Sequence, residues 1–479
     1  MLYPPCTHIF QKNQNQLLML KIQFKINIMI YRYINQVFKF WQIGFSGIIL
    51  ILLLFTANTY SQDYYSFKQC LQIGLENNYS IKIAKNDEII DENNYSLGNA
   101  GFLPYIYSEA NQSYSITDSR QVLASSPDPV EKDNAKSNAL SASVNLNWTI
   151  FDGFKMFVEY KKLNEMLQMG QLNTRMSIEN LVAQIGVEYY NVIQQKKRLE
   201  TIRYIKNLSK ERMKVAEERY RIGQESKLEF QQAKVDFNSD SSQFLNQSEN
   251  LSAAIIKLNK LLAVNIDKNT SPSDSISINY FLSLTDLLKE TQVNNTNLLL
   301  ALTNQSISEL NLKLVNSSRY PVLSLFGGAT LAQSESPASS VLESNSQGWN
   351  YGASLSFTIF DGFNINRQHK NARIDIQNAE LEYKEIEQEV LSTLALIYNT
   401  YQNSLKLVDL ERSNLQIARN NFDIAMERYR LGNFSGLEMR DVQRAYLDAE
   451  DRLLAAQYQA KIAEISLKQI SGKISDYLL

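Results

Sequence analysis

The chain has 479 residues with a formal net charge of −2, and 44% of its residues are hydrophobic. This composition is typical of a folded protein and allows two or three ordinary domains or one large architecture. Only 8 prolines and 17 glycines are present, so long regular elements are expected. With two histidines, two cysteines, no glycine-rich phosphate loop and no plausible Ser-His-Asp set, we expect no enzymatic activity, no cofactor and no bound metal.

The N-terminal region contains an apolar run at 41–57 that follows five basic residues and no acidic one. This arrangement predicts a secretory signal, with Met29 as a candidate start and cleavage before Gln62. An uncleaved anchor helix is the alternative, but the run is short for a membrane span of about 20 residues. Removal of residues 1–61 leaves 43 basic and 50 acidic residues, a charge of −7, which disfavours a nucleic-acid partner. Cys70 would then be the only cysteine, and we expect it to be buried on a helix.

Two motifs occur twice at one spacing. TIFDGF at 149–154 returns 209 residues later at 358–363, and ERYR-[IL]-G at 218–223 returns 209 residues later at 427–432. Because two motifs about seventy residues apart keep a common register, the sequence predicts an internal duplication.

The predicted organisation is a leader at 1–61, a first repeat over 62–270 and a second over 271–479. Each repeat is expected to run helix, strand, loop, strand, long helix, tight turn, long helix. The segments 121–138 and 332–347 are rich in turn-forming residues, so we expect them to be the loops between paired strands.

The second strand of each pair alternates apolar and polar residues, over 140–150 and again over 349–359. Period two over about twelve residues with aromatic ends is typical of a transmembrane barrel strand, with a soluble sandwich as the alternative. The strands that follow Pro104 and Pro321 alternate more weakly. Four strands cannot close a barrel, and open edges in lipid leave backbone groups unpaired, so the chain is predicted to oligomerise.

The helices are expected to be very long, because neither Pro nor Gly lies between Phe363 and Gly432. About 68 helical residues would span roughly 100 Å. Apolar residues recur at coiled-coil spacing, as in Leu181, Ile185, Tyr189 and Val192 and in Leu394, Tyr398, Tyr401 and Leu405.

The FDGF motif suits a sharp turn from strand into helix. Aspartate can cap the N–H groups of a helix, and glycine tolerates left-handed backbone angles. We therefore predict a structural role, without catalysis, for Asp152, Gly153, Asp361 and Gly362.

The order of elements, the proline before the first strand, the FDGF junction and the Tyr-x-x-Gly tips resemble the TolC family of outer-membrane efflux proteins. The resemblance implies an α+β membrane protein, a homotrimer whose four strands per chain complete a β-barrel in outer-membrane lipid. The barrel would continue into a long periplasmic α-helical coiled-coil barrel. The implied function is a passive exit duct of a tripartite efflux or type I secretion-like system, served by an inner-membrane pump and a periplasmic adaptor (membrane fusion protein). A periplasmic coiled-coil adaptor or scaffold without a pore is the rival interpretation.

The resemblance also implies roles for residues at the helix tips. Contact with the adaptor would involve Tyr220, Arg221, Gly223, Arg430 and Gly432.

Glu438 and Asp441 would form an acidic ring at the channel entrance. Such a ring would favour cations and be able to bind divalent metal, and Arg440 beside it would weaken this preference. A closed gate would pair Tyr429 with Glu229.

The sequence departs from the family at two positions. Phe434 stands where the prototype has a gate arginine, so the gate must be held differently, and Tyr79 stands where the family usually has proline.

Overall fold

A computed structural model of the chain describes Met29 and residues 64–123, 126–337 and 341–478. It divides into two units, Met1–Asp63 and Tyr64–Leu479, and the second contains the architecture described below. The predicted apolar signal run and its cleavage site lie outside the described residues.

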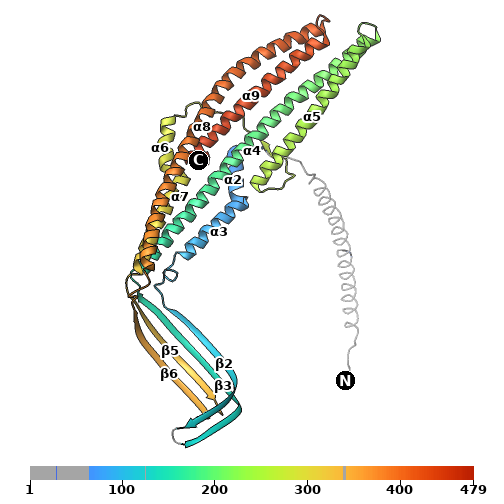
Figure 1. The fold of residues 1–479 in the computed structure, drawn as a ribbon. Coiled ribbons are helices and arrows are strands. Elements are labelled where there is room, and N and C mark those ends of the chain that lie inside the picture. The colour runs from blue at the N-terminus through green and yellow to red at the C-terminus, as the bar shows by residue number, and fades with distance from the viewer. Residues whose placement is uncertain (1–28, 30–63, 124–125, 338–340, 479) are drawn as a thin grey trace, which may run out of the picture. The chain divides into compact units, whose positions relative to one another are not determined.

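Two long helical hairpins dominate this unit (Figure 1). They are α4 (Lys155–Arg221) with α5 (Lys227–Leu262), and α8 (Asn364–Arg430) with α9 (Gly436–Ile470). Helices α4 and α8 have 67 residues each, which corresponds to about 100 Å. The prediction of very long helices is therefore confirmed. None of the helices within the described ranges is both long and apolar enough to span a membrane.

Four shorter helices precede the strands in pairs, where the sequence predicted one helix in each half. They are α2 (Phe67–Asn77), α3 (Tyr79–Asn94), α6 (Leu284–Asn294) and α7 (Thr296–Ser317). The breaks fall at Asn78 and Asn295, and each side chain accepts a hydrogen bond from the first turn of the helix that follows. Each asparagine also donates its side-chain N–H to the end of a hairpin, at Leu261 O (2.9 Å) and Ile470 O (2.8 Å) respectively. The breaks thus fix the short helices to the long ones.

The strands form one antiparallel sheet in the order β2-β3-β5-β6, at the end of the unit opposite the hairpin tips (Figure 1). Their bounds are β2 (Tyr105–Leu123), β3 (Ser126–Phe151), β5 (Val322–Glu335) and β6 (Glu343–Ser356). A short parallel pair, β1 (Tyr64–Tyr65) with β4 (Ser271–Pro272), lies outside this sheet. The four predicted strands are present, with β2 and β6 at the edges.

The prediction of a loop at 121–138 is wrong for most of that segment, because β2 ends at Leu123 and β3 begins at Ser126. Strand β3 pairs with β5 only as far as Asn138, and beyond it β2 and β3 continue as a two-stranded ribbon with register shifts near Ser119 and Leu123. Charged and turn-forming residues are tolerated there because neither strand is covered by a third. The loop predicted at 332–347 is shorter than expected, since β5 and β6 occupy both of its ends.

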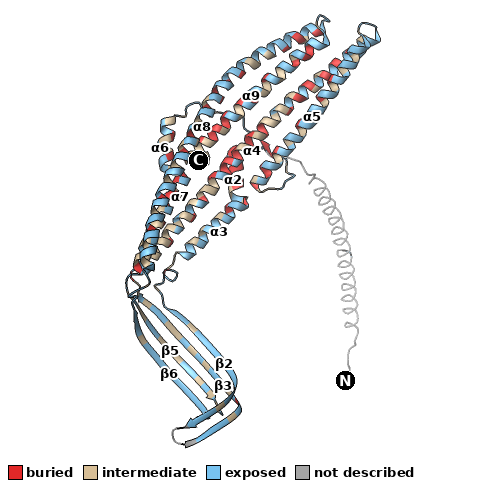
Figure 2. Ribbon diagram, in the orientation of Figure 1, coloured by how far each residue is buried: buried red, intermediate tan, exposed pale blue. Residues whose placement is uncertain are grey.

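Buried side chains concentrate along α4 and the helices around it, whereas the described residues of the sheet, apart from Ala135, are exposed or intermediate (Figure 2). The predicted stripe is buried, with Ile185 and Tyr189 fully enclosed. Cys70 packs in the same cluster and is fully buried, as predicted, and that burial raises its thiol pKa to about 12.

Candidate functional site

The strand-to-helix junctions have the same backbone in both halves. Gly153 and Gly362 both have φ of 70°, and the phenylalanine after each is also left-handed. Asp152 accepts the Met156 N–H at 3.0 and 3.2 Å, and Asp361 accepts the equivalent N–H of Ile365 at 2.6 Å. The phenylalanine at the start of each helix makes no side-chain cap. The aspartate before it therefore satisfies a backbone N–H of the first helical turn instead.

Both hairpin tips use one turn design. Gly223 and Gly432 have φ of 79° and 78°, a conformation that glycine adopts without steric cost. The next helix then begins with a capping box, in which Ser226 pairs with Glu229 in the first half and Ser435 with Glu438 in the second.

The predicted docking residues are all exposed at these tips, and Arg430 and Gly432 also line the cavity between them. Arg221 pairs with Glu218 at 3.1 Å and Arg430 pairs with Glu427 at 3.3 Å, each on its own helix and in contact with solvent. Tyr220 is stacked on an aromatic neighbour of the same hairpin, with ring centroids 6.0 Å apart.

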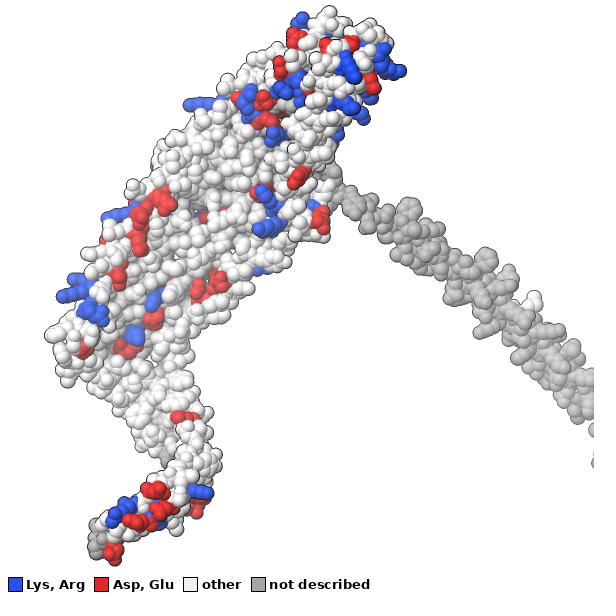
Figure 3. Space-filling model, turned by 45° about the vertical axis from the view of Figure 1, so that its right-hand side comes forward, with Lys and Arg blue, Asp and Glu red and all other residues white. Residues whose placement is uncertain are grey.

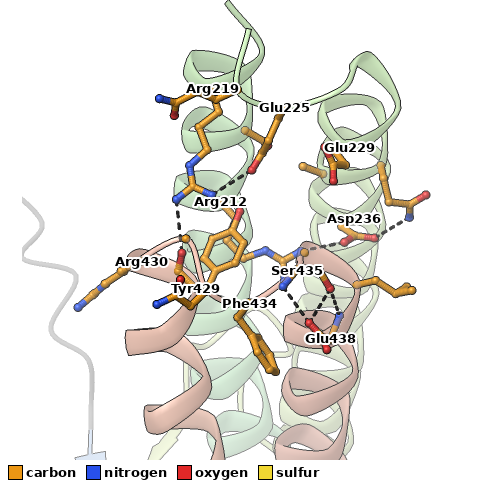
Figure 4. A pocket seen from close by; sticks show the side chains of 18 of the residues that line it. Arg212, Arg219, Glu225, Glu229, Asp236, Tyr429, Arg430, Phe434, Ser435 and Glu438 are labelled. Carbon is orange, nitrogen blue, oxygen red and sulfur yellow. Dashed lines mark hydrogen bonds and ion pairs between the residues drawn. The ribbon is translucent and has the colours of Figure 1, made fainter. Parts of the chain in front are cut away.

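A cavity of about 870 Å³ lies between the two tips and takes its lining from both hairpins (Figure 4). Arg219 crosses it: its guanidinium pairs with Glu225 at 3.0 Å, donates to the Tyr429 carbonyl at 3.4 Å and lies 5.6 Å from the centre of the Tyr429 ring. Phe434, at the position of the family's arginine, is only partly exposed, with its ring 5.3 Å from the Arg428 guanidinium. Arg219 of the first hairpin thus provides the positive charge that contacts Tyr429 of the second hairpin.

Tyr429 and Glu229 line the same cavity, but among the described residues no hydrogen bond joins them. The Glu229 carboxylate accepts instead from the Ser226 N–H at 2.9 Å and from its hydroxyl at 3.2 Å. Burial raises the Tyr429 pKa, although the nearby Arg212 opposes the shift, so the phenol keeps its proton as a donor. The structure therefore places Tyr429 and Glu229 in one cavity, but they are not hydrogen-bonded to each other.

Glu438 and Asp441 are both exposed on the first turns of α9. Hydrogen bonds from the Ser435 N–H and hydroxyl lower the Glu438 pKa, which favours its charged form. Arg440 does not lie beside these acids as expected from the sequence: it is buried and pairs with Asp240 of α5 at 2.7 Å. The positive charge is therefore turned away from the two exposed carboxylates.

Sequence reasoning missed a group of buried polar side chains just below the tips, which we call the buried network. It joins α4, α5 and α9 and consists of Ser209, Arg212, Asp236, Asp240, Arg440 and Gln443. All six are buried, and Asp240 is 1% exposed. The missed signal is a break in the apolar stripe of α4, where Ser209 and Arg212 continue the spacing of Ile202 and Ile205.

A family model described as outer membrane efflux protein matches residues 71–264 and 287–473. The chain belongs to the outer membrane efflux protein family. It is 21% identical over 195 residues to the outer membrane protein TolC of Salmonella enteritidis, a match that covers 40% of this chain and only 40% of that relative.

Solved outer-membrane channels have the same fold. The Campylobacter jejuni CmeC channel superposes with a TM-score of 0.71 at 16% identity, over 85% of this chain and 86% of CmeC. The Neisseria gonorrhoeae MtrE channel in its open state gives 0.66 at 16% identity, over 86% of this chain and 91% of MtrE. At these identities the likeness establishes the fold.

As a member of the outer membrane efflux protein family, the chain is located in the outer membrane and extends into the periplasm, as predicted. Its relatives are channel proteins and not enzymes. In the part of the chain that the structure describes, no group of three or more His, Cys, Asp or Glu side chains is placed to hold a metal.

Proposed function

We propose that the chain is one protomer of a trimeric outer-membrane duct of a tripartite efflux or type I secretion-like system. It would passively conduct solutes received from an inner-membrane pump through a periplasmic adaptor. The observation that supports this most directly is the pair of FDGF junctions, through which one four-stranded sheet continues into two helices of about 100 Å. Helices of that length suit a passage that leaves the membrane and crosses an aqueous compartment.

The membrane part would be a barrel of three sheets, twelve strands in all. Supporting this, the sheet has two unpaired edges, at β2 and β6, which lipid would not tolerate. No charged residue occurs in 137–151, 322–334 or 344–360. Charged side chains are few on this part of the sheet, whereas they gather on the far ribbon and are spread over the helices up to the hairpin tips (Figure 3). Apart from Glu109 of β2, this part of the sheet forms a band without charge that carries aromatic residues such as Tyr105, Trp148 and Trp349, which suits outer-membrane lipid.

The two halves would derive from one duplicated unit, with the leader at 1–61 and boundaries at 62–270 and 271–479. The equivalent anchors of Asn78 and Asn295 support this, because both reach a carbonyl at the end of a long hairpin.

At the periplasmic entrance, Glu438 and Asp441 would form the acidic ring, and the exposed tips around Gly223 and Gly432 would contact the adaptor. The exposure of both acids and the removal of Arg440 from their side support the ring. Tyr429 and Glu229 would form a gate contact only if Glu229 leaves its capping position.

The test is reconstitution of the purified full chain in planar lipid bilayers, with its oligomeric state measured in detergent. A trimer that conducts ions supports the duct. A water-soluble monomer without conductance would contradict it and would favour the scaffold alternative. Copurification of a pump and an adaptor would identify the pathway.

A further inference from the structure

We propose that Glu109 of β2 determines ion selectivity inside the membrane part of the duct, where it places a carboxylate on the wall of the lumen. This inference rests on the proposed function as a trimeric duct. It concerns the sheet, at the end of the unit opposite the acids of the periplasmic entrance. With three copies of the chain, three such carboxylates lie at one level of the pore.

Glu109 is an isolated charge in the middle of the four-stranded part of the sheet. Cross-strand pairing defines nine rows of residues there, from the row of Tyr105 to the row of Ser113, and Glu109 lies in the fifth. The strand segments that form these rows are 105–113, 139–147, 326–334 and 344–352, and they contain no other charged residue. At about 3.4 Å per residue the nine rows extend for about 27 Å along the strands, which suits the height of a membrane barrel.

The pleat of the sheet assigns Glu109 to one face. Paired residues on neighbouring strands point to the same side, and successive residues along a strand point to opposite sides. The face of Glu109 is polar and carries Asn111, Ser143, Asn145, Thr330 and Asn350. The other face is apolar and carries Ile106, Val144, Leu146, Leu331, Trp349 and Tyr351. Because the apolar face of a membrane barrel meets lipid, Glu109 faces the lumen.

Contacts between side chains agree with this assignment. The Glu109 carboxylate accepts a hydrogen bond from the Asn111 side chain at 2.8 Å, which places both on one face. A Cβ added at Gly328 would lie 2.8 Å from the Asn145 side-chain oxygen and 2.9 Å from that of Asn350. The polar face is therefore a continuous surface of amide and hydroxyl groups across the sheet.

The row that contains Glu109 leaves its charge prominent. The residues paired across the sheet in that row are Ser143, Thr330 and Gly348, so Glu109 has the longest side chain of the four, and it is exposed. None of the nine rows contains a lysine or arginine that could neutralise it. A carboxylate facing lipid at this depth is strongly unfavourable, whereas one in a water-filled lumen stays hydrated and attracts cations. The apolar wall of the barrel strengthens that field.

The first experiment measures reversal potentials in a potassium chloride gradient across planar bilayers. The full-length variants all carry Glu438→Gln with Asp441→Asn, so that the entrance acids cannot mask the contribution of Glu109. Adding Glu109→Gln is expected to lower the cation-to-anion permeability ratio by about twofold or more. The matched control is Glu343→Gln, which removes an acid of the same sheet that lies beyond the nine rows and on the apolar face. It should leave the ratio unchanged.

A rescue variant tests whether the position of the charge matters. Ser143→Glu in the Glu109→Gln chain puts the carboxylate on β3, in the same row and on the same face, and should restore the ratio. Glu109→Gln trimers that conduct with an unchanged ratio, or a rescue that has no effect, would overturn the role of Glu109 and leave the duct intact. If the unaltered chain does not conduct, the duct fails and this proposal fails with it.

Chemical modification in liposomes tests the face assignment without any current. Ser143→Cys should react with charged, water-soluble thiol reagents, and Val144→Cys on the opposite face should be protected by lipid. The buried Cys70 thiol, with its pKa raised to about 12, will not compete for the reagent.

A cationic reagent should modify Ser143→Cys faster than an anionic one, and Glu109→Gln should lower this rate ratio by about threefold or more. An unchanged ratio would overturn the role of Glu109, and a reactive Val144→Cys would overturn the face assignment. Protection at both positions would contradict the duct itself.

Discussion

The two helical hairpins have the same backbone design but different polar side chains. Their tip glycines differ in φ by one degree, 79° against 78°, and both second helices begin with a Ser–Glu capping box. The positions of Asp236 and Asp240 in the first hairpin are occupied, 209 residues later, by Ala445 and Ala449.

This difference distinguishes residues that build each hairpin from residues that join the two hairpins. Turn and cap residues occur in both halves, because the same hairpin has to be built twice. Buried charges occur where the hairpins meet, and a contact between unlike surfaces needs an anion on one and a cation on the other. The first hairpin contributes Asp240 and the second contributes Arg440.

The largest effect should come from making the second hairpin resemble the first. Ala449 is 1% exposed, so Ala449→Asp places a carboxylate in a buried position with no arranged partner. We expect a loss of about 3 kcal/mol or more in the free energy of unfolding, measured by denaturant titration in detergent. Ala445→Asp is the matched control, because Ala445 is exposed on the same helix, and it should change stability by less than about 0.5 kcal/mol. Equal losses at both positions would contradict the explanation from burial.

A smaller effect should distinguish the two strand-to-helix junctions. A Cβ at Gly153 would lie 2.4 Å from the Ser317 carbonyl oxygen, whereas at Gly362 its nearest neighbour would be a flexible Asn364 side chain at 3.6 Å. Both glycines are left-handed, so alanine costs about 1 kcal/mol at either. Gly153→Ala should lower the free energy of unfolding by about 2 kcal/mol more than Gly362→Ala, because the backbone at Ser317 would have to move. Thermal unfolding followed by circular dichroism tests the order of the two variants, and a reversed order would contradict the close approach at Gly153.

The two asparagine anchors should behave alike. Asn78→Ala and Asn295→Ala each remove a helix cap and a hydrogen bond to a carbonyl, at an expected cost of about 1–2 kcal/mol each. Equal shifts in the unfolding midpoint would sharpen the likeness of the two halves. A difference above about 1 kcal/mol would show that the anchors are not equivalent.

The smallest effect on stability, with a clear effect on selectivity, is expected at the entrance acids. Glu438→Gln with Asp441→Asn keeps the capping geometry but removes the charge, so cation preference and divalent block should weaken. Reversal potentials in a salt gradient measure this, with the exposed Asp409→Asn as control.

The pH dependence of the same selectivity follows from the lowered Glu438 pKa. A lowered pKa means that the carboxylate stays charged as the pH falls, until the pH passes below the usual glutamate range. Cation preference should therefore persist at mildly acidic pH. An early loss of preference, already near pH 6, would count against Glu438 as its source.

The long helices, the presence of four strands and the burial of Cys70 were predictable, because each depends on periodicity or on local turn chemistry. The ribbon within 121–138 was not, because Glu131, Lys132 and their neighbours pair with β2 in a strand that no third strand covers, and their composition is that of a loop. The breaks at Asn78 and Asn295 were missed because an asparagine cap inside a helical pattern is a weak signal.

The break in the α4 stripe marks buried polar residues, but their partners in the buried network could not be predicted from either hairpin by itself. Arg440 beside two acids suggests a surface charge, and only the tertiary packing of α9 against α5 turns it inward. The adaptor and gate roles of the tip residues remain predictions, since they depend on partners and on movement.

The open edges of the sheet have a consequence for biogenesis. Strand β6 contains no lysine and no proline, two residues that commonly protect an exposed edge from unwanted pairing. A newly exported chain would therefore be most prone to aggregate in the interval before it meets its partners. In the proposed trimer other copies close the sheet, so the yield of assembled protein should depend on the concentration of chains and on any chaperone that shields β2 and β6 until those copies arrive.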